Sequence, residues 1–321
     1  MPAKKAGPAD LSAPIFTNEA KARAHLEGLR WPNGAFCPHC GDTENVTSMN
    51  GDAHRAGLYQ CNSCREQFSV TVGTLFERSH LPLHKWLLAF HLMASSKKGV
   101  SAHQLHRMLG ITYKTAWFMG HRIRETMKTL HVGRIGGSGK TLEADETFWG
   151  QKPRQKGARK PRGGYQHKNV IVSLVERGGD VRSFHVPSAT AGAVRHVLDE
   201  QADKQSHLMT DDAKHYRKVG REFAKHDRVN HTRGEYVRGD AHTNTVEGYF
   251  SILKRGLVGT FHHVGVQHLH RYVAEFDFRY NHRLVRDMPE SDPRPVTDTE
   301  RATAMLRGIE RKRLTYRRTH S

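Results

Sequence analysis

The stretch TLEADETFWG at 141–150 is the most informative indication of the fold of the second half of the chain. Its apolar residues flank an acidic centre, so it is predicted to be a strand that carries carboxylates. Several strands in a row, followed by strands that alternate with helices, predict an α/β fold with a mixed sheet covered by helices. The other expected elements are strands HKNVIVSLVERGGD at 167–180, VRSFHVP at 181–187, SHLMTDD at 206–212 and KHDRVNH at 225–231, and helix TAGAVRHVLDEQA at 190–202.

Three acidic residues occupy special places in this pattern. Asp145 lies within the first strand, Asp211 ends the fourth, and Glu247 lies on a predicted helix, HTNTVEGYFSILKRG at 242–256. Carboxylates from strand ends and a neighbouring helix can converge and hold two divalent metal ions about 3.5–4 Å apart, the spacing used for in-line phosphoryl displacement. Such oxygen ligands suit Mg²⁺ or Mn²⁺ better than zinc. The simpler alternative for any one acid is a surface residue, and Glu146 and Asp212 are adjacent acids that compete for the assignment.

The helix that carries Glu247 has a basic residue on the same side. Lys254 follows Glu247 by seven residues, or two helical turns, and Ser251 lies between them on that face. Such a helix would place its lysine beside a DNA phosphate. The expected apolar stripe on the other side consists of Val246, Phe250, Leu253 and Leu257.

The four cysteines form two CxxC pairs and occur nowhere else. Cys37 and Cys40 are followed, after twenty residues, by Cys61 and Cys64. Two knuckles on successive hairpins at this separation predict one tetrahedral structural zinc ion. The alternative is four free buried cysteines. So small a segment buries little core, so the metal is expected to fold it, and His39 is expected to be a surface residue.

Residues 84–130 have helical periodicity. A helix HKWLLAFHLM is followed by SAHQLHRML with Ser101 as its cap, by a break at Gly110, and by TYKTAWFMGHRIRETMKTL from Thr112. The spacing predicts a helix-turn-helix. A plain three-helix bundle has similar spacing and remains the alternative. The residues expected to point outward from the second helix are Tyr113, Lys114, Thr115, His121, Arg122 and Arg124.

The charge of the chain favours a polyanionic partner. Its 51 Lys and Arg outnumber 32 Asp and Glu, giving a formal charge of +19, and nucleic acid is the commonest polyanion. A ribosome-associated or simply very soluble protein is the alternative. The loop at 151–166 has six basic residues and no acid, so it is either a solvated loop or a DNA-backbone contact. The predicted DNA contacts are Lys114, Arg122, Arg124, Lys152, Arg154, Lys156, Arg159, Lys160, Arg162 and Arg255.

Five blocks occur in one order: RWPNGAFCPHCG, CNSCREQFSVTVGTLFE, LEADETFWG, TDD and HTNTVEGYFSILKRGLVGTFHHV. In this order the chain resembles the bacterial insertion-sequence transposases that combine an N-terminal zinc ribbon with a DDE, RNase H-like catalytic domain. The resemblance covers nearly the whole chain. We therefore expect an N-terminal helix and zinc ribbon at 15–76, a helix-turn-helix-like region at 82–131, an RNase H-like catalytic domain at 140–285 and a basic tail at 286–321. Its last part, RATAMLRGIERKRLTYRRTHS at 301–321, is expected to be a helix followed by a frayed end, and either to bind DNA or to act as a solubilising extension.

The resemblance implies that Asp145, Asp211 and Glu247 bind Mg²⁺ or Mn²⁺, with Lys254 as the accompanying basic residue. Asn244, three residues before Glu247, is the alternative third ligand. The implied reaction is hydrolysis at terminal inverted repeats, followed by attack of the freed 3′-hydroxyls on target DNA. Because two DNA ends must be paired, a homo-oligomer on DNA is expected.

Two other functions remain open: an RNase H-like nuclease that does not join DNA, and a non-catalytic DNA-binding regulator. The chain lacks a stretch of roughly 18 apolar residues and a secretory signal at its N-terminus. A cytoplasmic, nucleoid-associated protein is therefore expected.

Overall fold

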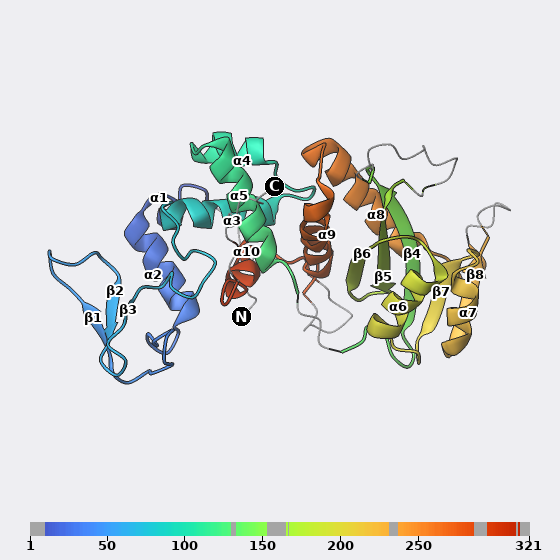
Figure 1. The fold of residues 1–321 in the computed structure, drawn as a ribbon, viewed down its shortest axis with the longest axis horizontal. Coiled ribbons are helices and arrows are strands. Elements are labelled where there is room, and N and C mark those ends of the chain that lie inside the picture. Colours follow the sequence, from blue (N-terminus) through green and yellow to red (C-terminus); the bar gives the residue numbers. More distant parts are fainter. Residues whose placement is uncertain are drawn as a thin grey trace, which may run out of the picture. The chain divides into compact units, whose positions relative to one another are not determined.

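The computed structural model describes residues 10–129, 133–152, 165, 167–230, 237–285, 294–312 and 314. The chain divides into two compact units (Figure 1). The first consists of Met1–Met127 together with Val285–Ser321, and the second of Lys128–Leu284. Within the described part of the chain, no helix is both long and apolar enough to cross a membrane.

The second unit is built on a five-stranded mixed sheet with β4 at its centre (Figure 1). The strand order is β6-β5-β4-β7-β8, in which β4, β5 and β6 are antiparallel, whereas β7 runs parallel to both β4 and β8. This order and these directions confirm the predicted RNase H-like mixed sheet. The strands are β4 (Thr141–Trp149), β5 (Asn169–Glu176), β6 (Val181–Val186), β7 (His207–Asp211) and β8 (Lys225–Val229).

Helices cover both faces of this sheet (Figure 1). One face packs against α6 (Ala191–Gln201) and α7 (Tyr216–Val219), and the other against α8 (Asn244–Gly256) and α9 (Val266–Asn281). Because successive side chains of a strand point to opposite faces, β4 sends two sets of residues in opposite directions. Leu142, Ala144, Glu146 and Phe148 face α6 and α7, whereas Glu143, Asp145 and Thr147 share the α8 and α9 face.

The first unit begins with α1 (Pro14–Thr17) and α2 (Glu19–Arg30), followed by a small antiparallel sheet. Asn18 is the N-cap of α2 and accepts a hydrogen bond from the backbone N–H of Lys21 at 3.0 Å. Trp31 packs against the aromatic rings of Phe36, Tyr59 and Phe68. The strands are β1 (Val46–Met49), β2 (Leu58–Cys61) and β3 (Gln67–Phe68).

Three further helices of this unit follow the predicted pattern: α3 (Leu83–Ser95), α4 (Ala102–Leu109) and α5 (Tyr113–Thr126). Ser101 forms a capping box with Gln104 at the start of α4. Gly110 ends that helix in the left-handed conformation, with φ of 59°, which glycine adopts without steric cost. Thr112 then caps α5 through its side chain. The local signals for a helix, a tight turn and a second helix are therefore confirmed.

The C-terminal segment contains the expected helix, but this helix packs into the first unit instead of forming a separate extension. Residues Asp298–Arg307 form α10, which packs against α3 of the first unit. Ala302, Met305 and Leu306 are buried at positions i, i+3 and i+4, an apolar stripe that the surrounding basic residues obscure in the sequence. Beyond the helix, the carbonyl of Ile309 accepts a hydrogen bond from the N–H of Leu75 at 3.0 Å. The segment is thus part of the fold.

A buried carboxyl on α9 ties this helix to the sheet. Asp277 accepts hydrogen bonds from the hydroxyls of Tyr249 and Ser183 at 2.5 and 2.7 Å, and from the N–H of Ser183 at 2.9 Å. Burial raises the pKa of Asp277 to about 7, although these hydrogen bonds oppose the rise. The group therefore stays protonated in the folded protein at pH values where an unfolded chain has lost that proton.

We expect Asp277 to make the protein less stable as the pH rises from about 4 to about 7. The raised pKa means that its contribution is fully present below the ordinary value of 3.8 and is lost as pH rises through the folded value. The loss over this range is about 2–4 kcal/mol at most. Urea unfolding at pH 5 and pH 7.5 measures it. Asp277→Asn should remove this part of the pH dependence, and an unchanged dependence in the variant would contradict the assignment.

Candidate functional sites

The structure brings Asp145, Asp211 and Glu247 together from three elements of the second unit. Asp145 comes from the middle of β4, Asp211 from the end of the adjacent parallel strand β7, and Glu247 from the first turn of α8. Burial raises the pKa of Asp145 well above its ordinary value, and the negative charges of Glu146, Asp211 and Glu247 raise it further. All three predicted carboxylates therefore lie within electrostatic reach of one another.

Each of these half-buried carboxylates has a local partner. The N–H of Glu146 donates to Asp145 Oδ1 at 2.8 Å, the N–H of Ala213 donates to Asp211 Oδ1 at 3.0 Å, and the hydroxyl of Thr243 donates to Glu247 Oε1 at 2.8 Å. The three carboxylates do not form a closed cage. Among the residues that the structure describes, a set of three or more histidine, cysteine or carboxylate ligands close enough for one metal ion occurs only at the four cysteines.

The two adjacent acids have other partners. Glu146 points to the opposite face of β4, where its Oε2 accepts a hydrogen bond from the Tyr216 hydroxyl at 2.9 Å and lies 3.2 Å from His215 Nε2. Asp212 forms ion pairs with Arg228 and Arg217 at 2.8 and 3.2 Å. Glu146 therefore lies on the opposite face of β4 from Asp145, and Asp212 is paired with arginines, unlike Asp211. Neither adjacent acid belongs to the cluster of Asp145, Asp211 and Glu247.

Helix α8 has the predicted two-sided character. Its stripe of Val246, Phe250, Leu253 and Leu257 is buried, whereas Ser251, Lys254 and Arg255 are exposed. Asn244, the alternative ligand, is exposed in the first turn. The helix continues into a π-helical turn, Leu257–Phe261, and the exposed His262 follows with a positive φ of 56°. The face that carries Glu247 and Lys254 is thus accessible.

The outward orientation predicted for the later part of α5 is wrong. His121, Arg122 and Arg124 are buried, and the two arginines are only 6% and 4% exposed. The guanidinium of Arg122 lies 5.2 Å from the ring centroid of Trp86 and donates to the carbonyl of Glu77 at 3.2 Å. A cation over an aromatic face is a stable interior arrangement, so this arginine supports the fold.

The beginning of α5 is exposed as predicted. Tyr113 is 45% exposed and its ring contacts that of His103 in a tilted arrangement with centroids 4.4 Å apart, and Lys114 beside it is also exposed. Lys152 is half-buried and donates to the carbonyl of Pro187 at 2.7 Å. The other predicted loop contacts, Arg154, Lys156, Arg159, Lys160 and Arg162, lie outside the described residues.

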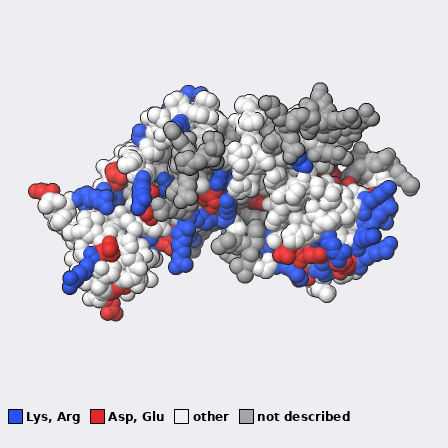
Figure 2. All heavy atoms as spheres, viewed as in Figure 1, with Lys and Arg blue, Asp and Glu red and all other residues white. Residues whose placement is uncertain are grey.

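A basic surface that we did not predict lies on the segment that follows Asp211. Lysine and arginine side chains gather at α7 and β8 of the second unit (Figure 2). The sequence offers a signal, since 214–228 holds six basic residues, but acids interrupt the run. These residues come to one edge only when α7 and β8 fold beside each other. We call this surface the basic edge: exposed Lys214, Arg217, Lys218, Arg221, Lys225 and Arg228.

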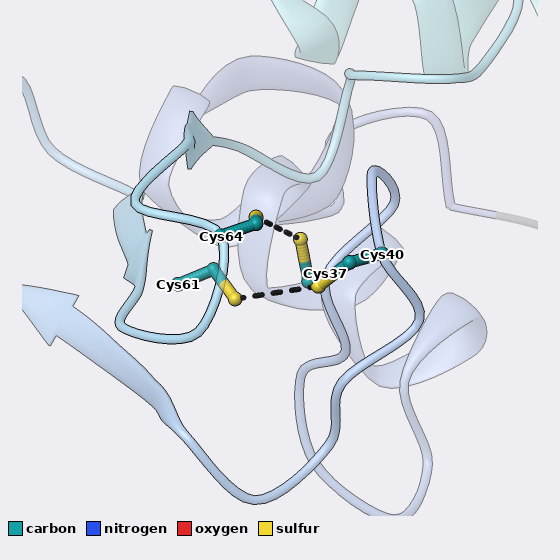
Figure 3. Close-up of side chains that lie close together, drawn as sticks. All are labelled: Cys37, Cys40, Cys61 and Cys64. Atoms are coloured by element: carbon teal, nitrogen blue, oxygen red, sulfur yellow. Dashed lines mark hydrogen bonds between the residues drawn. The ribbon is translucent and has the colours of Figure 1, made fainter.

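The four cysteines of the first unit form a compact cluster (Figure 3). The Sγ atoms of Cys37 and Cys64 are 3.6 Å apart, as are those of Cys40 and Cys61, and all four lie within 4.8 Å of one another. A tetrahedral zinc ion with Zn–S bonds of about 2.3 Å requires sulfur separations of about 3.8 Å. The cluster therefore has the dimensions of a structural zinc site.

The first cysteine knuckle also favours a thiolate. Burial raises the pKa of the Cys37 thiol, but hydrogen bonds from the backbone N–H groups of Cys40 and His39 and from the thiols of Cys64 and Cys40 together lower it to about 7. The His39 side chain is exposed and lies outside the cluster, as predicted. These features fit the deprotonated sulfur that zinc binds.

Comparison with known proteins finds a family domain in each unit. Residues 137–281 match the model of the ISXO2-like transposase domain, and residues 17–67 match that of the transposase zinc-ribbon domain. A protein of Halobacterium salinarum, described as an uncharacterized protein in transposable element ISH50, is 29% identical over 255 residues. That alignment covers 75% of this chain and 84% of the relative.

Two solved structures give weaker matches. One is the simian T-cell lymphotropic virus intasome in complex with PP2A regulatory subunit B56 gamma, with a TM-score of 0.30 and 13% identity, over 63% of this chain and 70% of the other. The second is the mariner Mos1 paired end complex with Mg, with a TM-score of 0.21 and 11% identity, over 61% and 74% of the two chains. Scores this low add no support to the fold assignment.

Proposed function

This chain belongs to the insertion-sequence transposases that carry an ISXO2-like transposase domain and a zinc ribbon, and we propose its function on that basis. It cleaves the ends of its element and joins them to target DNA by metal-dependent phosphoryl transfer. Asp145, Asp211 and Glu247 are the proposed metal ligands. The observation that carries this proposal is the convergence of three carboxylates from β4, β7 and α8.

The electrostatics of the cluster suit divalent cations. Neighbouring negative charges raise the pKa of Asp145, and a cation among the carboxylates would remove that repulsion. When bound, Mg²⁺ supplies the activation of water or a 3′-hydroxyl and the stabilisation of charge on the phosphate. The chain orients its own ligands: Thr243 holds Glu247, and the N–H of Ala213 holds Asp211. Binding of metal and DNA is expected to draw the carboxylates closer together.

The exposed cations near this site are suited to the phosphate backbone. The basic edge begins at Lys214, three residues after Asp211, and Lys254 and Arg255 are exposed on the helix of Glu247. Such contacts add affinity and fix the position of the duplex, but they carry no sequence information. We therefore assign them to DNA positioning at the carboxylates. Because transfer needs two paired ends, a homo-oligomer on DNA follows from the same proposal.

Sequence recognition is assigned to the first turn of α5. The recognition helix of a helix-turn-helix reads bases with its N-terminal residues, and this turn exposes Tyr113 and Lys114, whereas the last turns of α5 are buried. We expect Tyr113→Ala to reduce the preference for element-end DNA over a scrambled duplex about 10-fold. Competition binding by fluorescence anisotropy measures this ratio.

Two lysine variants distinguish sequence recognition by Tyr113 from non-specific electrostatic attraction to DNA. Lys140 is exposed and pairs with Glu176 on the second unit, so Lys140→Ala should leave the preference unchanged. Lys114→Ala is expected to weaken binding to both duplexes and to lower its salt dependence. If Tyr113→Ala weakened binding to both duplexes equally, the three helices would be a plain bundle and not a sequence reader.

The function itself is tested by the products formed from labelled ends of the element that flanks the gene. With Mg²⁺, purified protein is expected to give products in which those ends are covalently joined to target DNA. Cleavage without joining would identify a nuclease. Specific binding without either product, together with full biological activity of Asp145→Asn, would identify a regulator.

A further inference from the structure

A fourth carboxylate on β4 lies two residues before Asp145 and shares its face of the sheet. The Glu143 side chain is 0% exposed, and a buried charge is tolerated only when it is paired and hydrogen-bonded. Its partners therefore show what it is used for. They come from the start of α8 and from Arg177, which directly follows β5.

Glu143 caps α8 from outside the helix. Its Oε2 accepts hydrogen bonds from the backbone N–H groups of Thr245 and Val246 at 2.8 and 3.0 Å, and its Oε1 accepts one from the Thr245 hydroxyl at 2.8 Å. Free N–H groups at a helix start attract a negative charge. The N-cap residue Thr243 makes no capping hydrogen bond with its side chain, and its hydroxyl donates to Glu247 instead.

Arg177 completes the attachment. Its Nε donates to Glu143 Oε1 at 2.6 Å, while its two terminal nitrogens donate to the carbonyls of Asp240 and His242, each at 2.9 Å. The guanidinium thus balances the buried charge and holds the segment that leads into α8. His242 is half-buried in this arrangement, with Nδ1 2.9 Å from Arg177.

We infer that Glu143 is a positioning residue: by fixing the first turn of α8 on β4, it sets where Glu247 stands relative to Asp145. Asp145 is on the same strand as Glu143, and Glu247 directly follows Val246 in the first turn of α8, which Glu143 holds. A change at Glu143 therefore moves one proposed ligand relative to another without touching either. This inference rests on the proposed function, because it assumes that these carboxylates bind metal together.

The test is Glu143→Gln, examined by titrating Mn²⁺ into the protein bound to pre-cleaved element-end DNA. The amide places an N–H₂ group against donors and removes the charge, so the first turn of α8 loses part of its attachment. Outer-sphere changes of this kind typically lower metal affinity about 10–100-fold. We expect a loss in that range, a matching rise in the Mn²⁺ concentration needed for joining, and unchanged DNA affinity without metal.

The matched control is Glu275→Gln. Glu275 is equally buried in the second unit and pairs with Arg279 at 2.6 Å, but both residues lie on α9. The Glu275→Gln variant should lose a similar amount of folding stability to Glu143→Gln, and yet bind Mn²⁺ as tightly as the wild type does. If Glu143→Gln does not fold, Arg177→Lys tests the same contact, because lysine keeps the charge but cannot reach all three acceptors; a smaller loss in the same direction is expected.

The outcomes separate this inference from the proposed function. Wild-type Mn²⁺ affinity in Glu143→Gln, or in Arg177→Lys where the first variant does not fold, would overturn the inference. Equal losses in Glu143→Gln and Glu275→Gln would overturn it too, since they would indicate a general effect of stability. Wild-type protein that binds Mn²⁺ through Asp145 but never joins DNA would remove the proposed function and leave the positioning role standing. Absence of Mn²⁺ binding by the wild-type complex would contradict both.

Discussion

Replacing Asp211 with asparagine is expected to lower strand joining about 10³-fold or more, because loss of a ligand removes several kcal/mol of charge stabilisation from the reaction. The adjacent Asp212 provides the control. Asp212 is paired with Arg217 and Arg228, so Asp212→Asn should join DNA within about threefold of the wild-type rate, the effect of a surface ion pair.

Joining rates on pre-cleaved ends measure both variants, with DNA binding measured in parallel. Comparable losses of the joining rate in the two variants would mean that joining depends on the negative charge of this segment and not on the position of one carboxylate. An Asp211→Asn variant that kept more than about a tenth of the activity would remove Asp211 from the proposed ligand set, because loss of a metal ligand costs far more.

Replacing Cys61 with serine should remove the zinc and unfold the ribbon. Cys61 is fully buried in the cysteine cluster, and structural zinc contributes roughly 10–16 kcal/mol to the folding of comparable small domains. The aromatic packing around Trp31 is too small to replace that contribution. We expect zinc content to fall from one ion per chain to none and near-ultraviolet circular dichroism from the ribbon aromatics to be lost.

The matched control for the zinc ligand is His39→Ser, which changes an exposed residue of the other knuckle, between Cys37 and Cys40. It should retain one zinc per chain and the wild-type spectrum. Full zinc content in Cys61→Ser would show that the cysteine cluster does not hold the metal, and loss of zinc from His39→Ser would add a ligand that the geometry does not include.

Much of the fold could be predicted because its signals are local. Apolar stretches predicted each strand of the sheet, and Ser101, Gly110 and Thr112 marked the helix ends by capping and left-handed geometry. The carboxylates could be proposed because two strand positions and one helix carry them in order. The spacing of the cysteines likewise predicts the zinc ribbon, because two CxxC pairs twenty residues apart can supply the four ligands of one zinc ion.

The errors have one physical cause: long polar side chains do not reveal their burial in sequence. Arg122 was predicted to be outside, but its stem and guanidinium pack over Trp86, a contact between helices distant in the chain. The sequence pattern does not single out Glu143, because its partners lie 34 to 103 residues away. The α10 stripe was obscured by basic neighbours, and its packing partner α3 is some 200 residues earlier.

If Asp145, Asp211 and Glu247 form a metal site that joins DNA, loss of one of these carboxylates must nearly abolish joining. This dependence is measured by joining of pre-cleaved element ends in Mg²⁺. Wild type, Glu247→Gln and Asn244→Ala are compared side by side, with end binding measured for each. We predict joined product from the wild type and from Asn244→Ala, and about 10³-fold less from Glu247→Gln. Full joining by Glu247→Gln, or no joining by a wild-type protein that still binds the ends specifically, would contradict the account.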